Sequence, residues 1–547
     1  MSMVKRALIY ASIGIAAYLS VGLAAFLNNP NAQMGENTDP LNNEPVDAQK
    51  TFEGQFCNES QENANDYVAE FKVPTYCSLP LGITADTGGN VWYVSTRPGN
   101  IGKFDPRSGE FAEFEIPEWQ PRDTGLLQER SQVWRLRFDG DGNLWFTDER
   151  QNAIWRFFPL DERFEKYSIP VSANGSANIY PADIVFDKNE NVYAVGLRST
   201  QLWFASKADL QDGTSQGFSG IPIPLEGFEG ISADLITVGA LAMDNEKDEV
   251  WFPVLSYKQK GQLMKFDIET KAFTVFDMPP NVKSPVGLLA SGGVLWITDQ
   301  GTSTFLKFDP VKEEFSTYTT SLVSPRVNGG KQFDNSYTLP YWLLSDSQGN
   351  IWFNEHTGNK MAKFDPITET LIEYWIPTQN PAFGLCEDVK NETISAGCGL
   401  ANVLQFGLDA QGNAWFTEWT ENKIGMVNGT KAIPFVVEPA QKNITVKRGD
   451  TAQIEINVRP AGNPPKMPTL ADSRVQLAVS GTFTPTGNLG NTTATFTRDA
   501  LAFFTQDNAT TLSITPSSNI EAGKYAITVS ADYGDVSYGA VIRITVV

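Results

Sequence analysis

The chain is poor in the residues that bind transition metals and in basic charge. Its 547 residues include one histidine, His356, and four cysteines. One histidine without a neighbouring histidine or cysteine is weak evidence for a zinc-type site. Lys and Arg number 42 against 64 Asp and Glu, a formal net charge of -22. Because nucleic-acid binding needs a basic face, we do not expect nucleic acid as a partner.

The chain contains many copies of one sequence motif, called the phrase below. Each copy has a turn, an aromatic strand, a polar loop and an alternating strand, and five clear copies occupy residues 90–106, 143–159, 294–310, 350–366 and 413–429. Self-similarity at intervals of tens of residues marks an architecture in which no unit buries its apolar face alone. Four short strands per copy, separated by turn residues, predict the blades of an all-β propeller.

One aromatic anchor per copy predicts seven blades: Trp92, Trp145, Tyr193, Trp251, Trp296, Trp352 and Trp415. The third copy departs from the phrase after Tyr193, which indicates an insertion. The last copy lacks a fourth strand, while residues 67–74 resemble a fourth strand without a blade of their own. We therefore expect this segment to pair with residues 423–427 and close the ring, leaving no open sheet edge.

The N-terminus predicts export. Lys5 and Arg6 precede an apolar run over residues 7–27, about long enough to cross a bilayer. Positive charge before the run favours a single-pass transmembrane helix within residues 1–28 and a propeller outside the cell. A cleaved signal peptide is the alternative. Residues 29–66, rich in Asn, Gln, Glu and Asp, are expected to form a flexible stalk.

Cysteines and sequons are consistent with an extracellular location. We predict the local disulfides Cys57 with Cys77 and Cys386 with Cys398, although four cysteines permit three pairings. The expected glycosylation acceptors are Asn58, Asn174, Asn391, Asn428, Asn443, Asn491 and Asn508.

The phrase does not return after Gly429. Residues 431–547 alternate with period two and are rich in Thr, Ser and Val, which predicts an immunoglobulin-like β-sandwich after a propeller spanning residues 67–430. This region has no cysteine and hence no inter-sheet disulfide. Spacing or adhesion is its expected role.

The copies WFTEWTENKIGMV, WFTDERQNAIWRF and WFNEHTGNKMAKF resemble repeats of the virginiamycin B lyase-like (streptogramin lyase) propellers, over residues 67–428. The resemblance implies seven blades, and the family's type enzyme opens a cyclic depsipeptide by magnesium-dependent elimination. That chemistry uses Pro-His pairs at the inner strands of the last two blades, and a glutamate before the second pair. The aligned residues here are Pro340-Tyr341 and Asn402-Val403-Leu404, which supply neither histidine nor that glutamate.

Four acidic residues stand three positions after a blade anchor: Asp148, Asp299, Glu355 and Glu418. Equivalent strand ends converge toward one face of a propeller, so these carboxylates are candidate ligands for calcium or magnesium. The alternative is a structural role in which each acid bonds loop amides or a neighbouring blade.

Aromatic residues near the same rim are candidate ligand contacts: Trp134, Tyr341, Trp342 and Trp419. They could stack on a sugar or an apolar ring, or serve only in packing between blades. His356, beside Glu355, is a candidate base or ligand contact, or a hydrogen-bonded loop residue.

Two functional hypotheses follow. One is a membrane-anchored surface receptor or adhesin that binds an extracellular small molecule, glycan or protein. The other is a metal-assisted lyase or hydrolase acting on esters or lactones. The missing histidines favour the binding protein, and the acidic positions keep the enzyme as the alternative.

Overall fold

The computed structural model describes residues 57–58, 60–119, 131–170, 179–210, 217–231, 235–256, 261–330, 336–381, 383, 398–462, 473–484, 489–504 and 508–547. The predicted transmembrane helix and residues 29–56 of the predicted stalk lie outside these residues. Within them, no helix is both long and apolar enough to span a membrane.

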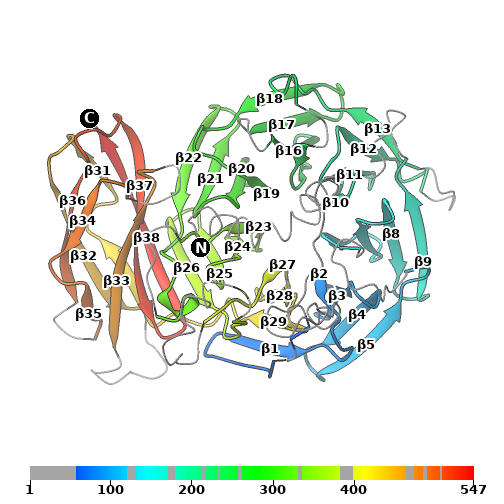
Figure 1. Ribbon diagram of the computed structural model, residues 1–547, viewed down its shortest axis with the longest axis horizontal. Helices are drawn as coiled ribbons and strands as arrows, with labels where there is room; N and C mark the ends of the chain where they lie inside the picture. Colours follow the sequence, from blue (N-terminus) through cyan, green and yellow to red (C-terminus); the bar gives the residue numbers. More distant parts are fainter. Residues whose placement is uncertain are drawn as a thin grey trace, which may run out of the picture.

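Seven sheets surround a common axis in the described part of the chain (Figure 1). Blade one holds β2 (Pro80–Ala85), β3 (Val91–Ser95), β4 (Asn100–Asp105) and β5 (Glu110–Glu115). Blade two holds β6 (Leu136–Phe138), β7 (Leu144–Asp148), β8 (Ala153–Phe158) and β9 (Arg163–Ser168). Blade three holds β10 (Pro181–Phe186), β11 (Val192–Gly196), β12 (Gln201–Ala205) and β13 (Ser219–Pro222). The inner strand of blade four is divided into β14 (Ile236–Val238) and β15 (Ala242–Asp244), which both pair with β16 (Glu249–Ser256), followed by β17 (Gln262–Asp267) and β18 (Phe273–Asp277).

The remaining blades follow the same order from the axis outward. Blade five holds β19 (Pro285–Ser291), β20 (Val294–Asp299), β21 (Thr304–Asp309) and β22 (Glu314–Thr319), and the 3-10 turn η3 (Pro325–Val327) follows it. Blade six holds β23 (Pro340–Ser345), β24 (Ile351–Glu355), β25 (Lys360–Asp365) and β26 (Thr370–Trp375). Blade seven holds β27 (Val403–Leu408), β28 (Ala414–Glu418), β29 (Lys423–Val427) and, outermost, β1 (Val68–Lys72).

The blade anchors are held by a turn acid. In blade six, Asp346 accepts hydrogen bonds from the Asn350 amide at 2.9 Å and from Trp352 Nε1 at 3.0 Å. Burial works against ionisation, but hydrogen bonds from Asn350 and Trp352 outweigh it and lower the pKa of Asp346. The anchor tryptophans of blades one, two and seven donate the same hydrogen bond to a turn aspartate: Asp86, Asp139 and Asp409. A turn residue thereby fixes the ring that packs against the next blade.

The predicted ring closure is confirmed. β1 pairs antiparallel with β29 in a continuous register from Val68 opposite Val427 to Lys72 opposite Lys423. A side-chain hydrogen bond also joins the first and last blades, since Thr417 Oγ1 of blade seven donates to the Leu81 carbonyl of blade one at 2.9 Å. No backbone edge of β29 is left unpaired along this register, which is the structural purpose of the closure.

The last part of the predicted flexible stalk is ordered, so that prediction is wrong for residues 57–66 where they are described. Asn58 Nδ2 and Ser60 Oγ donate to Glu421 at 2.7 and 3.0 Å. Asn65 Nδ2 donates to the Trp375 carbonyl at 2.8 Å. The polar side chains of this segment, from which we predicted a solvated stalk, donate hydrogen bonds to blades six and seven.

The predicted disulfide between Cys57 and Cys77 is present. Cys398 is also disulfide-bonded, and its predicted partner Cys386 lies outside the described residues. The sequons at Asn174 and Asn391 lie outside them as well. The amide nitrogen of the Asn58 sequon is already engaged by Glu421.

Residues 433–547 form two sheets that share one core. One sheet contains β30 (Phe435–Pro439), β32 (Ala452–Pro460), β36 (Ala509–Thr515) and β34 (Thr493–Phe496). The other contains β31 (Asn443–Val446), β38 (Val536–Val546), β37 (Gly523–Tyr533), β33 (Arg474–Gly481) and β35 (Ala500–Ala502). The immunoglobulin-like assignment of this region stays a prediction.

The C-terminal region is not a detached spacer. β38 pairs with β26, from Thr370 opposite Ala540 to Tyr374 opposite Val536, so blade six continues into a nine-stranded sheet (Figure 1). Thr528 Oγ1 donates to the Thr319 carbonyl of blade five at 2.7 Å. These contacts attach the region to two blades at once.

Candidate functional site

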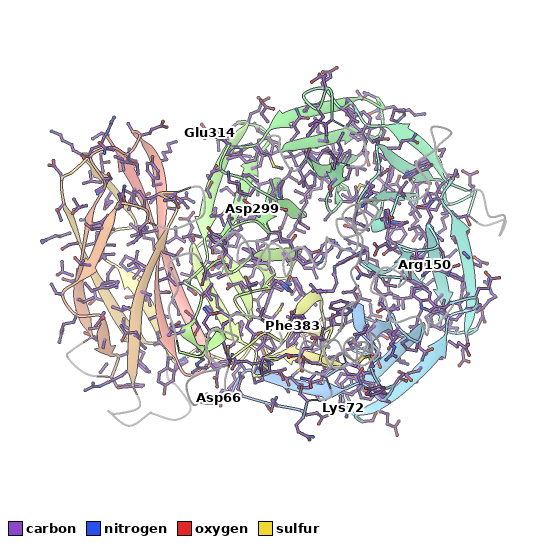
Figure 2. All side chains as sticks on the ribbon, viewed as in Figure 1. Asp66, Lys72, Arg150, Asp299, Glu314 and Phe383 are labelled. Atoms are coloured by element: carbon purple, nitrogen blue, oxygen red, sulfur yellow. A yellow bond between two sulfur atoms is a disulfide. The ribbon has the colours of Figure 1, made fainter. Side chains whose placement is uncertain are left out.

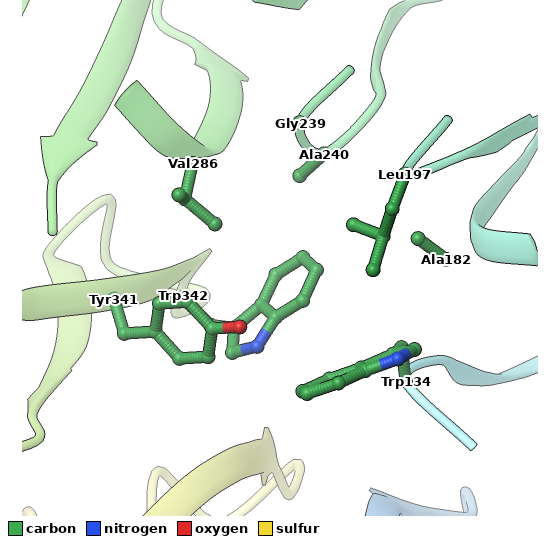
Figure 3. Close-up of a pocket in the computed structure, with 8 residues that line it drawn as sticks. All are labelled: Trp134, Ala182, Leu197, Gly239, Ala240, Val286, Tyr341 and Trp342. Carbon is green, nitrogen blue, oxygen red and sulfur yellow. The ribbon is translucent and has the colours of Figure 1, made fainter. Parts of the chain in front are cut away.

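Three aromatic side chains meet at the ring axis. Trp134, Tyr341 and Trp342 line a pocket on the face where the inner strands begin, together with Ala182, Leu197, Gly239, Ala240 and Val286 (Figure 3). The empty space of about 280 Å³ includes open solvent, and the enclosed part has room for about one water molecule. Its walls come from blades two to six and are almost entirely apolar, as in sites that take up an apolar group.

A series of polar contacts links the inner strands next to these rings. The Arg135 guanidinium lies 4.4 Å from the centre of the Trp342 ring. Arg135 also donates to both oxygens of Asp183, at 2.6 and 3.0 Å, and Asp183 accepts from the Leu241 amide at 2.9 Å. A desolvated cation–π contact is worth about 2 kcal/mol, and the paired guanidinium satisfies the buried carboxylate. Blades six, two, three and four are thereby linked through the centre.

Sequence reasoning missed Arg135 and Asp183. Alignment on the blade anchors places both at the same inner-strand position as Trp342, where blades one, four and five carry Gly82, Ala240 and Gly287. Two residues of opposite charge, in neighbouring blades and at a position that is small in blades one, four and five, were the available signal.

The pocket aromatics differ in how their polar atoms are used. Trp134 Nε1 donates to Glu149 at 3.1 Å. Trp342 is 4% exposed, and its Nε1 has no acceptor among the described residues. Gln405, at the equivalent position of blade seven, likewise has a buried Nε2 without an acceptor in the described part. A buried N–H without an acceptor is costly, so these donors are suited to an incoming acceptor.

Asp148 and Asp299 are structural acids. Asp299 accepts three backbone N–H bonds, from Lys283 at 2.8 Å, Ser284 at 2.7 Å and Gly301 at 3.0 Å (Figure 2 labels Asp299 in blade five). Burial nevertheless raises the pKa of Asp299. Asp148 accepts from Trp155 Nε1 at 2.9 Å and from the Gln151 amide at 3.0 Å. Both carboxylates accept these hydrogen bonds from residues of their own blade or of the loop that leads into it.

Glu418 belongs to a buried Glu–Lys–Glu cluster in blade seven. Lys423 Nζ lies 2.8 Å from Glu70 and 3.9 Å from Glu418, and all three side chains are inaccessible to solvent. Burial, followed by the charge of Glu70, raises the pKa of Glu418 well above its ordinary value. The shift favours the protonated form of Glu418 beside the ion pair of Glu70 and Lys423.

Blade six repeats this arrangement. Glu355 ends β24 opposite Lys360, whose Nζ lies 3.5 Å from Glu373. Burial, and then the charge of Glu373, raise the pKa of Glu355 well above its ordinary value. Against burial, the Lys360 ammonium lowers the pKa of Glu373. In both clusters a lysine ammonium lies among the carboxylates.

The predicted metal ligands do not come together. Among the residues that the structure describes, no group of three or more His, Cys, Asp or Glu side chains could hold a metal ion. Lys423 lies 3.9 Å from Glu418, and Lys360 pairs with Glu373 in the cluster of Glu355, so an ammonium group already offsets carboxylate charge in each cluster. The donor set therefore does not fit the divalent ion expected from the sequence.

His356 and Trp419 are buried away from the axial pocket's lining. His356 Nδ1 lies 3.3 Å from the Val403 carbonyl, and its backbone N–H donates to the Leu339 carbonyl. Trp419 is 4% exposed, and its backbone N–H donates to the Asn402 carbonyl. Of the five ligand-contact candidates, the pocket brings together Trp134, Tyr341 and Trp342.

Solved structures similar to this chain include lyases. A streptogramin B lyase is 20% identical with a TM-score of 0.49, over 66% of this chain and 97% of that chain. A virginiamycin B lyase from Staphylococcus aureus is 17% identical with a TM-score of 0.48, over 66% of this chain and 98% of that chain. No protein-family model and no curated protein matches the chain. The chain is thus similar in structure to the lyases that its repeats resemble, at identities that describe a fold and not an activity.

Proposed function

We propose that the propeller is a ligand-binding module that binds a small apolar or aromatic group at the mouth of the axial pocket. The observation that carries this proposal is the convergence of Tyr341 with Trp134 and Trp342, two tryptophans that are extra to the blade repeat. Rings at the axis are not needed to join neighbouring blades, whose anchors already do so. An aromatic-lined pocket with few polar atoms favours an apolar guest.

Binding is a better proposal than lyase or hydrolase chemistry. Tyr341 and Leu404 occupy the positions where the lyase family has its histidines, and both are buried. The retained acids Glu355 and Glu418 are clustered with lysines. We expect no ring opening of a streptogramin-type depsipeptide with or without magnesium, as followed by mass spectrometry; turnover would restore the enzyme hypothesis.

The proposed setting is the outer side of a membrane, with the protein anchored through residues 1–28. The disulfide between Cys57 and Cys77 supports an oxidising compartment. The ligand would then be an extracellular small molecule, glycan or protein segment that presents an apolar group.

The test is isothermal titration of the purified full-length chain with 1-naphthaleneacetamide, a neutral aromatic probe. Ala182→Leu puts a larger side chain into the pocket and is expected to weaken binding at least tenfold, and Ala240→Val offers a second obstruction. Ala112→Leu, on the exposed side of β5, is the matched control and is expected to bind normally. Binding that survives both pocket substitutions would refute the proposal.

A further inference from the structure

The glycosylation motif Asn-x-Ser/Thr has a different structural setting at each place where the structure describes it. The acceptor is the side-chain amide of the asparagine, and the hydroxyl two residues later is the other group that the motif requires. A folded chain can carry a glycan only where both groups reach solvent. Five of these motifs lie within the described residues, at Asn58, Asn428, Asn443, Asn491 and Asn508.

The fold holds the acceptor group at two of the five. Asn58 Nδ2 donates to Glu421 at 2.7 Å, and Glu421 is inaccessible to solvent. Asn428 Oδ1 accepts from the hydroxyl of its own motif, Thr430 Oγ1, at 2.9 Å. Attaching a sugar at either asparagine would break a contact of the native structure.

At Asn508 the hydroxyl is the group that is withheld. Thr510 is 5% exposed, and its Oγ1 lies 3.0 Å from Thr497 Oγ1. The same oxygen accepts from the Arg498 amide at 3.0 Å. The motif of Asn508 therefore faces the interior at one of its two required positions.

The other two motifs present both groups outward. Asn443 and Thr445 of β31 are exposed, while Val446 of the same strand is buried. Alternate residues of a strand share a face, so the amide and the hydroxyl point to solvent together. Asn491 and Thr493, the first residue of β34, are likewise exposed.

Both exposed motifs also lie at sheet edges of the C-terminal region (Figure 1). Among the described strands, β31 pairs with β38 alone, and β34 is the last strand of its sheet beyond β36. An edge strand offers unpaired backbone groups to another chain, and natural proteins cover such edges. A bulky, solubilising group at these places would do so.

We propose that Asn443 and Asn491 carry N-linked glycans, which shield the edges at β31 and β34. The sugar comes from a lipid-linked oligosaccharide through a membrane transferase. The asparagine nitrogen bonds to the anomeric carbon and gives one proton to a base of the transferase. The bond from that carbon to the lipid phosphate breaks, and the phosphate leaves with the electron pair. This inference rests on the predicted export of the chain and is independent of the axial pocket.

The experiment maps the glycans on the full-length chain produced in the secretory pathway of cultured insect cells. Enzymatic release in heavy-oxygen water converts each modified asparagine to a labelled aspartate, which peptide mass spectrometry counts. We expect the occupancy of Asn443 and of Asn491 to be at least fivefold higher than that of Asn58, Asn428 or Asn508. Unmodified Asn443 and Asn491, or equal occupancy at all five, would overturn the assignment.

The shielding role has its own variants. Thr445→Ala with Thr493→Ala removes both motifs, whereas Thr445→Ser with Thr493→Ser keeps them and is the matched control. By light scattering, the alanine variant should self-associate at a concentration at least fivefold lower than the serine variant does. The unchanged chain should match the alanine variant once its glycans are enzymatically removed, and circular dichroism melting checks that each chain is folded. Equal self-association of glycosylated and glycan-free chains would overturn the shielding role.

Discussion

At the scale of single residues, one repeat position serves two chemical roles. The shorter Asp299 reaches three loop amides and stays within its own turn. The longer Glu418 extends toward Lys423 and Glu70 on the next strands, where one charge must be neutralised. The cluster holds two carboxylates and one ammonium, and the raised pKa of Glu418 favours a proton as the balancing charge.

The raised pKa of Glu418 predicts that the free energy of unfolding depends on pH in an unusual direction. Because its native pKa is raised, the native state holds a proton that the unfolded state has lost above a pKa of about 4.3. The contribution of Glu418 to the free energy of unfolding is therefore complete below that pH and declines as the pH rises toward the native pKa. Glu418→Gln cannot ionise but keeps an N–H donor, so we expect it to exceed the original chain in stability by about 1 kcal/mol at pH 8.

The measurement is urea unfolding of both chains at pH 5 and pH 8. The stability difference should shrink at pH 5, where Glu418 protonates at little cost. Glu314→Gln, an exposed acid that begins β22, serves as the control and should follow the original chain at both values. A Glu418→Gln chain that is less stable at pH 8 would show that the carboxylate is ionised in the native state.

At the scale of elements, the closing strand shows how a local pattern and a distant partner cooperate. The alternation of residues 67–74 predicted a strand, and the incomplete last blade predicted its neighbour. The structure adds a side-chain lock, in which Glu70 accepts from Thr378 Oγ1 at 2.6 Å and from Lys423 Nζ at 2.8 Å. β1 therefore connects blade seven to the loop that follows blade six.

Removing β1 should open the ring. A chain that begins at Thr75 leaves the backbone of β29 unpaired and Lys423 without Glu70, so we expect aggregation and loss of the cooperative thermal transition. Size-exclusion chromatography and calorimetry measure both effects. Because this truncation also removes Cys57, the control is full-length Cys57→Ser with Cys77→Ser.

That control retains β1 and loses the bridge between residues 20 positions apart, so it should stay soluble and be destabilised by about 3 kcal/mol. A soluble truncated chain with an unchanged transition would show that the ring closes without β1.

At the scale of the whole molecule, the C-terminal region and the propeller share a sheet and a core. Ala526 and Val541 pack in the same cluster as Leu371 and Tyr318 of the blades. Glu369 accepts from Tyr318 at 3.0 Å and pairs with Arg543. The two parts are expected to unfold together.

A chain that ends at residue 430 should expose the edge of β26 and the buried Leu371, which is 1% exposed in the full structure. We expect it to melt at a lower temperature and to associate through the free edge, as followed by calorimetry and light scattering. Arg326→Gln removes a partly exposed ion pair with Asp535 and should cost at most about 1 kcal/mol. Two separate transitions in the full-length chain would contradict a shared folding unit.

The sequence by itself determined the number of blades and the closing strand, because turn residues and alternation act locally along the chain. It predicted the Cys57–Cys77 bridge from the short separation of the two cysteines, as one of three permitted pairings. It also pointed to Trp134, Trp342 and Trp419 as residues outside the repeat, of which the pocket contains the first two. Only the tertiary structure decided that Trp134, Tyr341 and Trp342 line one pocket beside Arg135, that burial raises the pKa values of Glu355 and Glu418, and that β38 extends blade six. Those outcomes depend on desolvation and on contacts between distant segments, for which the order of residues along the chain carries no local signal.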